Sequence, residues 1–126
     1  MKSGFVTRPP FRWVEGKRLG QLTDDLVYQD EVFGPVMAPR NFETDFGTIP
    51  RLLWPIDSPI EHDIVYPSAL HDFLYFTKAD GNFSRKEADD IFYRAMLDEN
   101  APKWKALGRY WAVRMFAGFN GGWKKR

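Results

Sequence analysis

Two predicted helices joined by a short polar loop constrain this chain more than any other feature. The first is predicted from Pro67, a residue suited to a first helical turn, to Ala79. The second begins after Ser84, because Ser84 and Glu87 form the pattern of a capping box, and it runs to Asp98. The loop between them is short, so the two helices are expected to be antiparallel neighbours.

The first predicted helix carries polar side chains of unusual chemistry on one face. At about 100° per residue, its apolar side consists of Ala69, Leu70, Phe73, Leu74 and Phe76. His71, Asp72 and Tyr75 fall on the other side, so an imidazole, a carboxylate and a phenol share a face. On the second helix, Asp89 flanks the apolar arc and can lie across from His71.

A carboxylate behind a histidine can serve two different purposes. Asp89 can fix the tautomer of His71 and stabilise the imidazolium that forms when the other ring nitrogen takes a proton, as a general base requires. The alternative is a buried hydrogen bond that only locks the two helices together. Asp72 favours a functional site, because Asp89 cannot easily serve both neighbours and Asp72 then needs a cation of its own.

Asp45 and Gly47 lie in a segment, residues 41–51, that shows no helical or strand periodicity. An acid beside a glycine suits oxygen ligation of a hard cation, because glycine lets backbone carbonyls turn inward. Arg51 offers a competing explanation, a salt bridge to Asp45 in place of a metal. An ordinary turn with a solvated aspartate is the third possibility.

The order of these motifs resembles secreted phospholipase A2, above all its short prokaryotic form. The blocks that carry the resemblance are Glu43-Thr-Asp-Phe-Gly-Thr-Ile-Pro50, His71-Asp-Phe-Leu-Tyr75, Asp89-Asp-Ile-Phe-Tyr93 with Met96, and Tyr110-Trp-Ala-Val-Arg114 with Phe116 and Gly118. The same blocks also resemble an uncharacterised family of small phage and prophage proteins. The chain departs from the exported enzymes in having no cysteine, and residues 1–40 do not resemble them.

The resemblance implies a role for each matching residue. His71 matches the base that activates water, Asp89 matches the acid that orients it, and Tyr75 matches a phenol that braces the site. The implied ligands of a calcium ion are Asp72, Asp45 and the backbone carbonyl of Phe46.

Composition sets broad limits on size, partners and location. The chain has 126 residues, of which 44% are apolar, which suits one domain with one core. Its net charge of +1 implies no polyanion partner, so no nucleic acid is expected. The sequence shows no signal-peptide pattern and no apolar run of bilayer length. Together with the lack of cysteine, this predicts a protein made in a bacterial host cytoplasm without an export signal.

The expected fold class is α+β, with a small N-terminal antiparallel sheet packed on a C-terminal three-helix core that resembles phospholipase A2. Residues 1–42 are expected to form mainly turns and two to four strands, 43–66 a loop and connector, and 67–118 the helical core. A hairpin is predicted across a turn at residues 30–34, with Pro35 marking an edge strand.

The third predicted helix runs from Pro102 to Ala117. Its apolar residues cover most of the circumference, which predicts a helix packed on several sides. Arg109 and Arg114 on this helix are expected to pair with acids or carboxylate-like ligands.

Three functions are compatible with these features. The first is a calcium-dependent lipolytic esterase of phage origin that acts at a phospholipid or membrane surface. The second is a non-catalytic virion or assembly protein of the tail or baseplate, carried in the particle and bound to other phage structural proteins. The third is a metal-dependent phosphohydrolase, because His62 and Asp63 followed by His71, Asp72 and Asp89 give a formal ligand order whose spacing fits poorly.

Overall fold

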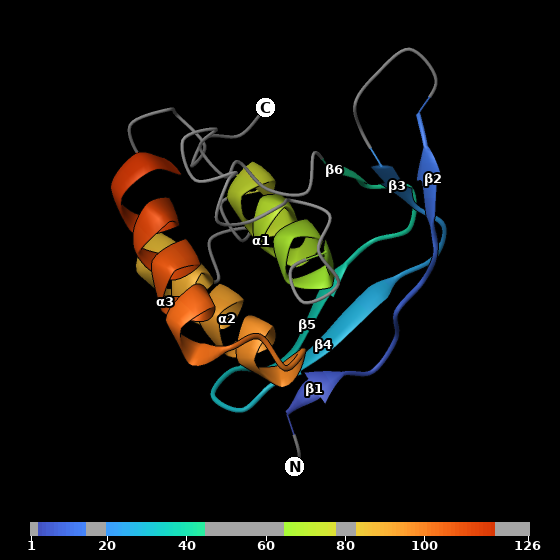
Figure 1. Cartoon of the computed structure of the whole chain (residues 1–126). Coiled ribbons are helices and arrows are strands. Elements are labelled where there is room, and N and C mark those ends of the chain that lie inside the picture. Colours follow the sequence, from blue (N-terminus) through green and yellow to red (C-terminus); the bar gives the residue numbers. More distant parts are fainter. Residues whose placement is uncertain (1–2, 15–19, 45–64, 78–82, 118–126) are drawn as a thin grey trace.

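The computed structural model describes residues 3–14, 20–44, 65–77 and 83–117, and within them strands are followed by helices (Figure 1). The strands are β1 Gly4–Phe5, β2 Phe11–Trp13, β3 Gly20–Leu22, β4 Leu26–Asp30, β5 Gly34–Ala38 and β6 Glu43–Thr44. The helices are α1 Val65–Thr77, α2 Arg85–Asp98 and α3 Lys103–Ala112, and a π-helical turn, η3 Val113–Ala117, continues α3. This arrangement confirms the α+β class.

The strands form two small antiparallel sheets, with orders β1-β4-β5 and β2-β3-β6. The predicted hairpin is confirmed, since Leu26 pairs with Ala38 and Asp30 with Gly34. Pro35 lies in β5 at the edge of its sheet, also as predicted. The described part of residues 1–42 contains five strands, more than the two to four expected, because β1, β2 and β3 have only two or three residues each. Strands of that length show no readable periodicity.

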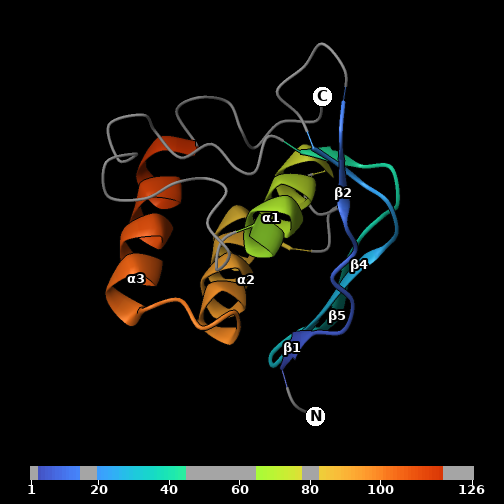
Figure 2. The same cartoon turned by 45° about the vertical axis from the view of Figure 1, so that its right-hand side comes forward.

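The helices form two layers beside the strands. Figures 1 and 2 both show α1 and α2 next to the strands and α3 on the outer side of α2. The core contains apolar side chains of β4, β5, α1 and α2, among them Leu26, Tyr28, Val36, Leu70, Ile91 and Met96. In the described ranges, no helix combines the length and the apolar character that crossing a bilayer requires.

Helix α2 has defined ends, as its sequence predicts. The Ser84 hydroxyl accepts the backbone N–H of Glu87 at 3.0 Å, and the Glu87 carboxylate accepts the backbone N–H of Ser84 at 2.9 Å. This reciprocal pair is the capping box. At the other end, Asn100 has a φ of 68°, and its N–H reaches the carbonyl of Leu97 at 3.0 Å. Asn100 therefore ends the helix in the left-handed conformation that asparagine tolerates.

A buried ion pair ties the β4–β5 hairpin to α2. Arg94 Nε donates to Asp30 Oδ1 at 2.8 Å, and Arg94 Nη2 donates to Asp30 Oδ2 at 3.1 Å. Asp30 Oδ2 also accepts the backbone N–H groups of Val32 and Phe33, both at 3.0 Å. This one carboxylate therefore closes the turn and anchors it to the helix.

Helix α3 differs from its prediction. It begins at Lys103 with Pro102 as the preceding cap residue, and its α-helical part ends at Ala112. Trp104 and Trp111 lie exposed on its surface, so the expected packing on several sides was wrong. Apolar residues around the whole circumference of a helix predict burial only where other elements pack against it. The spacing of residues along one helix does not show where those elements lie.

We predict that Asp30→Asn lowers the free energy of unfolding by about 3 kcal/mol, because Arg94 would remain partly buried without its carboxylate. Glu31→Gln is the matched control at the next, exposed position and should change stability by no more than about 0.5 kcal/mol. Urea unfolding measures both, and equal losses would show that the ion pair does not anchor the hairpin.

Candidate functional site

The carboxylate of Asp89 on α2 is the point where α1, α2 and η3 meet. Its exposed fraction is 0%. Oδ1 accepts from His71 Nε2 at 2.7 Å and from the Tyr75 hydroxyl at 2.6 Å. Oδ2 accepts from Arg114 Nη1 at 2.8 Å. The structure therefore brings together three residues of the predicted site, His71, Tyr75 and Asp89.

The surroundings of Asp89 keep it ionised. Burial alone raises the pKa of Asp89, but the hydrogen bonds from His71, Tyr75 and Arg114 outweigh burial and lower its pKa below the usual value. Burial and the hydrogen bond to Asp89 raise the pKa of Tyr75, which keeps the phenol protonated as a donor. Burial lowers the pKa of Arg114, but its hydrogen bond to Asp89 raises it overall, so the guanidinium stays charged.

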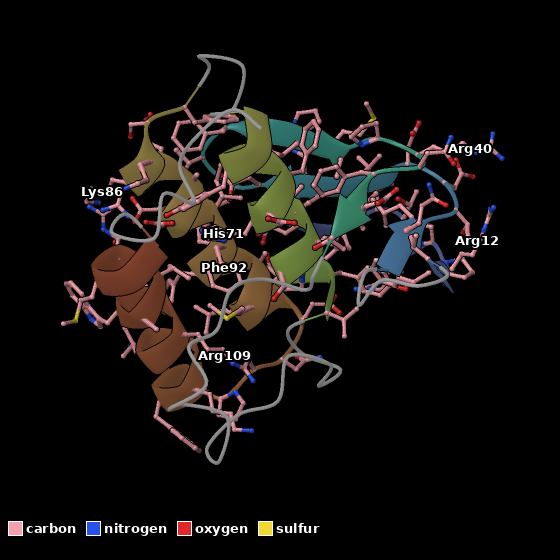
Figure 3. All side chains as sticks on the ribbon, turned by 90° about the horizontal axis from the view of Figure 1, so that it is seen from above. Arg12, Arg40, His71, Lys86, Phe92 and Arg109 are labelled. Carbon is pink, nitrogen blue, oxygen red and sulfur yellow. The ribbon has the colours of Figure 1, made fainter. Side chains whose placement is uncertain are left out.

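The ionised state of Asp89 determines the tautomer of His71. A carboxylate only accepts hydrogen bonds, so His71 Nε2 carries the hydrogen and Nδ1 of the neutral ring carries the lone pair. The ring is 5% exposed and lies 4.5 Å from the ring of Phe92 and 4.2 Å from that of Tyr75, centroid to centroid. Figure 3 shows His71 beside Phe92 between α1 and α2. The geometry suits a general base, and it would equally lock the two helices together.

Of the predicted calcium ligands, one lies in the described part of the chain. Asp72 is buried on α1 next to His71. Asp45, Phe46 and the competing partner Arg51 lie outside the described residues, as does His62 of the phosphohydrolase hypothesis. Within the described ranges, no group of three His, Cys, Asp or Glu side chains could hold a metal ion.

The sequence predicts an acidic partner for Arg114 without identifying it, and in the structure that partner is Asp89. The pair is separated by 25 residues, and no local pattern links the two positions.

Arg85 is a second residue that the sequence analysis missed. It lies one helical turn before Asp89, with its Nη1 3.9 Å from Asp89 Oδ2. It also donates to the carbonyls of Val113 and Arg114 at 3.4 and 3.3 Å, which supports the π-helical turn.

Comparison with known proteins places the chain in a family. The sequence pattern of the family described as "Protein of unknown function (DUF1353)" matches residues 20–113. The chain belongs to this family, and the matched range contains His71, Tyr75 and Asp89 and ends one residue before Arg114.

One relative among curated proteins is similar over most of this chain. It is the uncharacterized protein y4jT of Sinorhizobium fredii (strain NBRC 101917 / NGR234), which is 28% identical over 118 residues. The similarity covers 89% of this chain and 33% of the relative, so the chain spans about a third of that protein's length. No solved structure matches the chain.

We predict that Asp89→Asn lowers the free energy of unfolding at neutral pH by about 3 kcal/mol, because the guanidinium of Arg114 loses its carboxylate. Because folding lowers the pKa of Asp89, the stability this group contributes is present above about pH 4 and is lost as the pH falls below that range. The difference between wild type and variant should therefore shrink in acid.

Asp90→Asn is the matched control, because Asp90 is partly exposed and pairs with Lys86, and an asparagine oxygen can still accept the hydrogen bond from the Tyr110 hydroxyl. Exposed ion pairs contribute little, so the loss of stability in Asp90→Asn should be clearly smaller than the loss in Asp89→Asn. Urea unfolding at several pH values measures both variants. If Asp89→Asn lowers the free energy of unfolding no more than Asp90→Asn does, Asp89 is not the residue that holds the three helical elements together.

Proposed function

We propose that this protein is a hydrolase of lipid esters, of phage or prophage origin, in which His71 is the general base. The observation that carries the proposal is the 2.7 Å contact between His71 Nε2 and Asp89 Oδ1. It leaves Nδ1 of the ring as the proton acceptor. The resemblance of the four sequence blocks to phospholipase A2 supports the choice of a lipid ester as substrate.

The chemistry needs one proton to move twice. His71 Nδ1 takes a proton from water while the water oxygen bonds to the ester carbonyl carbon. The same nitrogen then gives the proton to the alkoxide as the carbon–oxygen bond breaks, which yields a carboxylic acid and an alcohol and restores the neutral ring. Asp89 stays ionised throughout and stabilises the imidazolium. Tyr75 and Arg114 hold Asp89 in place as positioning residues.

The proposal includes a calcium ion. Asp72 would hold it, together with Asp45 and the backbone carbonyl of Phe46, since carboxylate and carbonyl oxygens are the ligands that calcium prefers. When bound, the ion would polarise the ester carbonyl. The burial of Asp72 directly after His71 supports this part of the proposal, because a buried carboxylate is costly unless a cation or hydrogen bonds compensate it.

A second candidate function is a non-catalytic virion or assembly protein. The observation that favours it is the saturation of Asp89, whose two oxygens bind groups from two other helical elements. Such a cluster holds helices together whether or not His71 moves protons. The metal-dependent phosphohydrolase stays third, since it needs His62 and nothing in the described residues supports it.

We predict that His71→Gln folds and loses hydrolysis of mixed phospholipid vesicles by at least about a hundredfold, the scale of lost general-base catalysis. Glutamine can keep a hydrogen bond to Asp89, but its amide accepts no proton near neutral pH. His62→Ala is the matched control with the other histidine, and it should keep nearly full activity. Fatty acid release measures the rates.

The same experiment separates the two candidate functions. If the wild type hydrolyses no phospholipid, with or without calcium, and His71→Gln only lowers stability or blocks particle assembly, the esterase proposal is wrong. The assembly protein would then be the better account of the Asp89 cluster.

For calcium, we predict that millimolar concentrations raise the melting temperature, because a ligand that binds only the folded state stabilises it by mass action. Asp72→Asn should abolish this shift, whereas Asp90→Asn, the control on α2, should keep it. Differential scanning calorimetry measures the shifts. Equal shifts in wild type and Asp72→Asn would remove Asp72 from the calcium site.

A further inference from the structure

The outer face of α3 and η3 carries a continuous row of exposed apolar side chains, which we call the outer stripe. Its members are Trp104, Leu107, Trp111 and Met115. Their spacing of three or four residues places them on one side of the helix. Trp104 is 63% exposed, and Trp111 and Met115 are each 57% exposed. Two tryptophans that face solvent in one row are uncommon in a soluble fold and indicate an interaction surface.

The opposite face of the same helix is buried. Ala106, Arg109 and Ala112 face the rest of the protein, and Arg114 reaches Asp89. Figure 2 shows α3 as the outermost helix, with α2 on its inner side. The outer stripe is therefore not part of the core, and α3 separates it from the His71–Asp89 pair.

The charged residues of α3 and η3 have one sign. Lys103 and Lys105 flank Trp104 in sequence, and at about 100° per residue they fall on the two sides of the stripe. Lys103 is exposed, and Lys105 Nζ lies 5.9 Å from the centroid of the Trp104 ring. Residues 103–117 contain no Asp or Glu. The face is apolar along its middle and cationic at its edges.

We propose that the outer stripe binds the surface of an anionic phospholipid membrane, with α3 lying in the plane of the headgroups. Tryptophan prefers the boundary between headgroups and acyl chains, where its ring is apolar and its N–H stays hydrated. Lysines beside it gain from the negative surface potential of anionic lipid. An apolar face with tryptophan and flanking lysines is the pattern of helices that lie in such an interface.

A second copy of the chain fits this surface less well. A symmetric dimer places the same patch of both copies against itself. Contact through the outer stripe would therefore bring two cationic helices together, with no acid in residues 103–117 of either copy to compensate the lysines. An anionic lipid surface matches both the apolar row and its cationic edges.

As a statement about the substrate, this inference rests on the proposed function, because docking would hold the protein at the surface that contains its lipid ester. As a statement about binding, it is independent of catalysis. His71→Gln should bind vesicles as well as the wild type does, so a failure of hydrolysis and a failure of docking give different results.

The experiment measures binding to vesicles of phosphatidylcholine mixed with phosphatidylglycerol and to vesicles of phosphatidylcholine alone. The wild type should bind the mixed vesicles more tightly, with a blue shift of tryptophan emission and weaker binding at high salt. Trp104→Ser combined with Trp111→Ser should lower the partition coefficient by at least about tenfold, and Lys103→Glu should lower it for the mixed vesicles alone.

Val32→Ser is the matched control, because Val32 is 63% exposed in the β4–β5 turn, away from the outer stripe. It should bind as the wild type does. Thermal melts check that each variant folds, which the exposure of the substituted side chains favours. The proposal is overturned if the wild type binds neither vesicle, or if the tryptophan variants bind unchanged. Self-association that these variants abolish, without vesicle binding, would assign the outer stripe to a second copy instead.

Discussion

The buried carboxylate of Asp89 is the interaction on which the helical half of this structure depends. A carboxylate with no exposure is expensive to remove from water unless charge and hydrogen bonds compensate the loss. Here His71 and Tyr75 come from α1 and Arg114 comes from η3, so compensation requires all three elements to meet at one point. The position of η3 is set in the same way, since Arg85 on α2 binds two of its carbonyls.

Arg114 gives the site a property that the resemblance to phospholipase A2 does not imply. Together with the hydrogen bonds from His71 and Tyr75, its guanidinium keeps Asp89 ionised, and the ionised carboxylate fixes the tautomer of His71. The same positive charge offsets part of the field with which Asp89 would stabilise an imidazolium. The contacts therefore hold Asp89 and His71 in fixed orientations. They stabilise an imidazolium less than a His–Asp pair without a neighbouring cation would. That balance is why a catalytic role and a scaffolding role both follow from the same contacts.

The sequence predicted those structural elements whose pattern lies within a few consecutive residues. The capping box at Ser84 and the antiparallel helices that bring Asp89 to His71 are both present. Two kinds of feature were missed for physical reasons. The shortest strands hold too few residues for a period to show. The Asp89–Arg114 contact and the exposure of Trp111 depend on tertiary placement, which the spacing along one helix does not determine.

The central claim is that ionised Asp89 holds the Nε2–H of His71 and leaves Nδ1 as the acceptor, and nitrogen NMR of the His71 ring tests it most directly. In labelled protein at neutral pH, two-bond correlations between the ring nitrogens and carbon-bound protons distinguish the two tautomers of a neutral imidazole. The account predicts the Nε2–H form in the wild type and a loss of this preference in Asp89→Asn. A wild-type ring in the Nδ1–H form would contradict it.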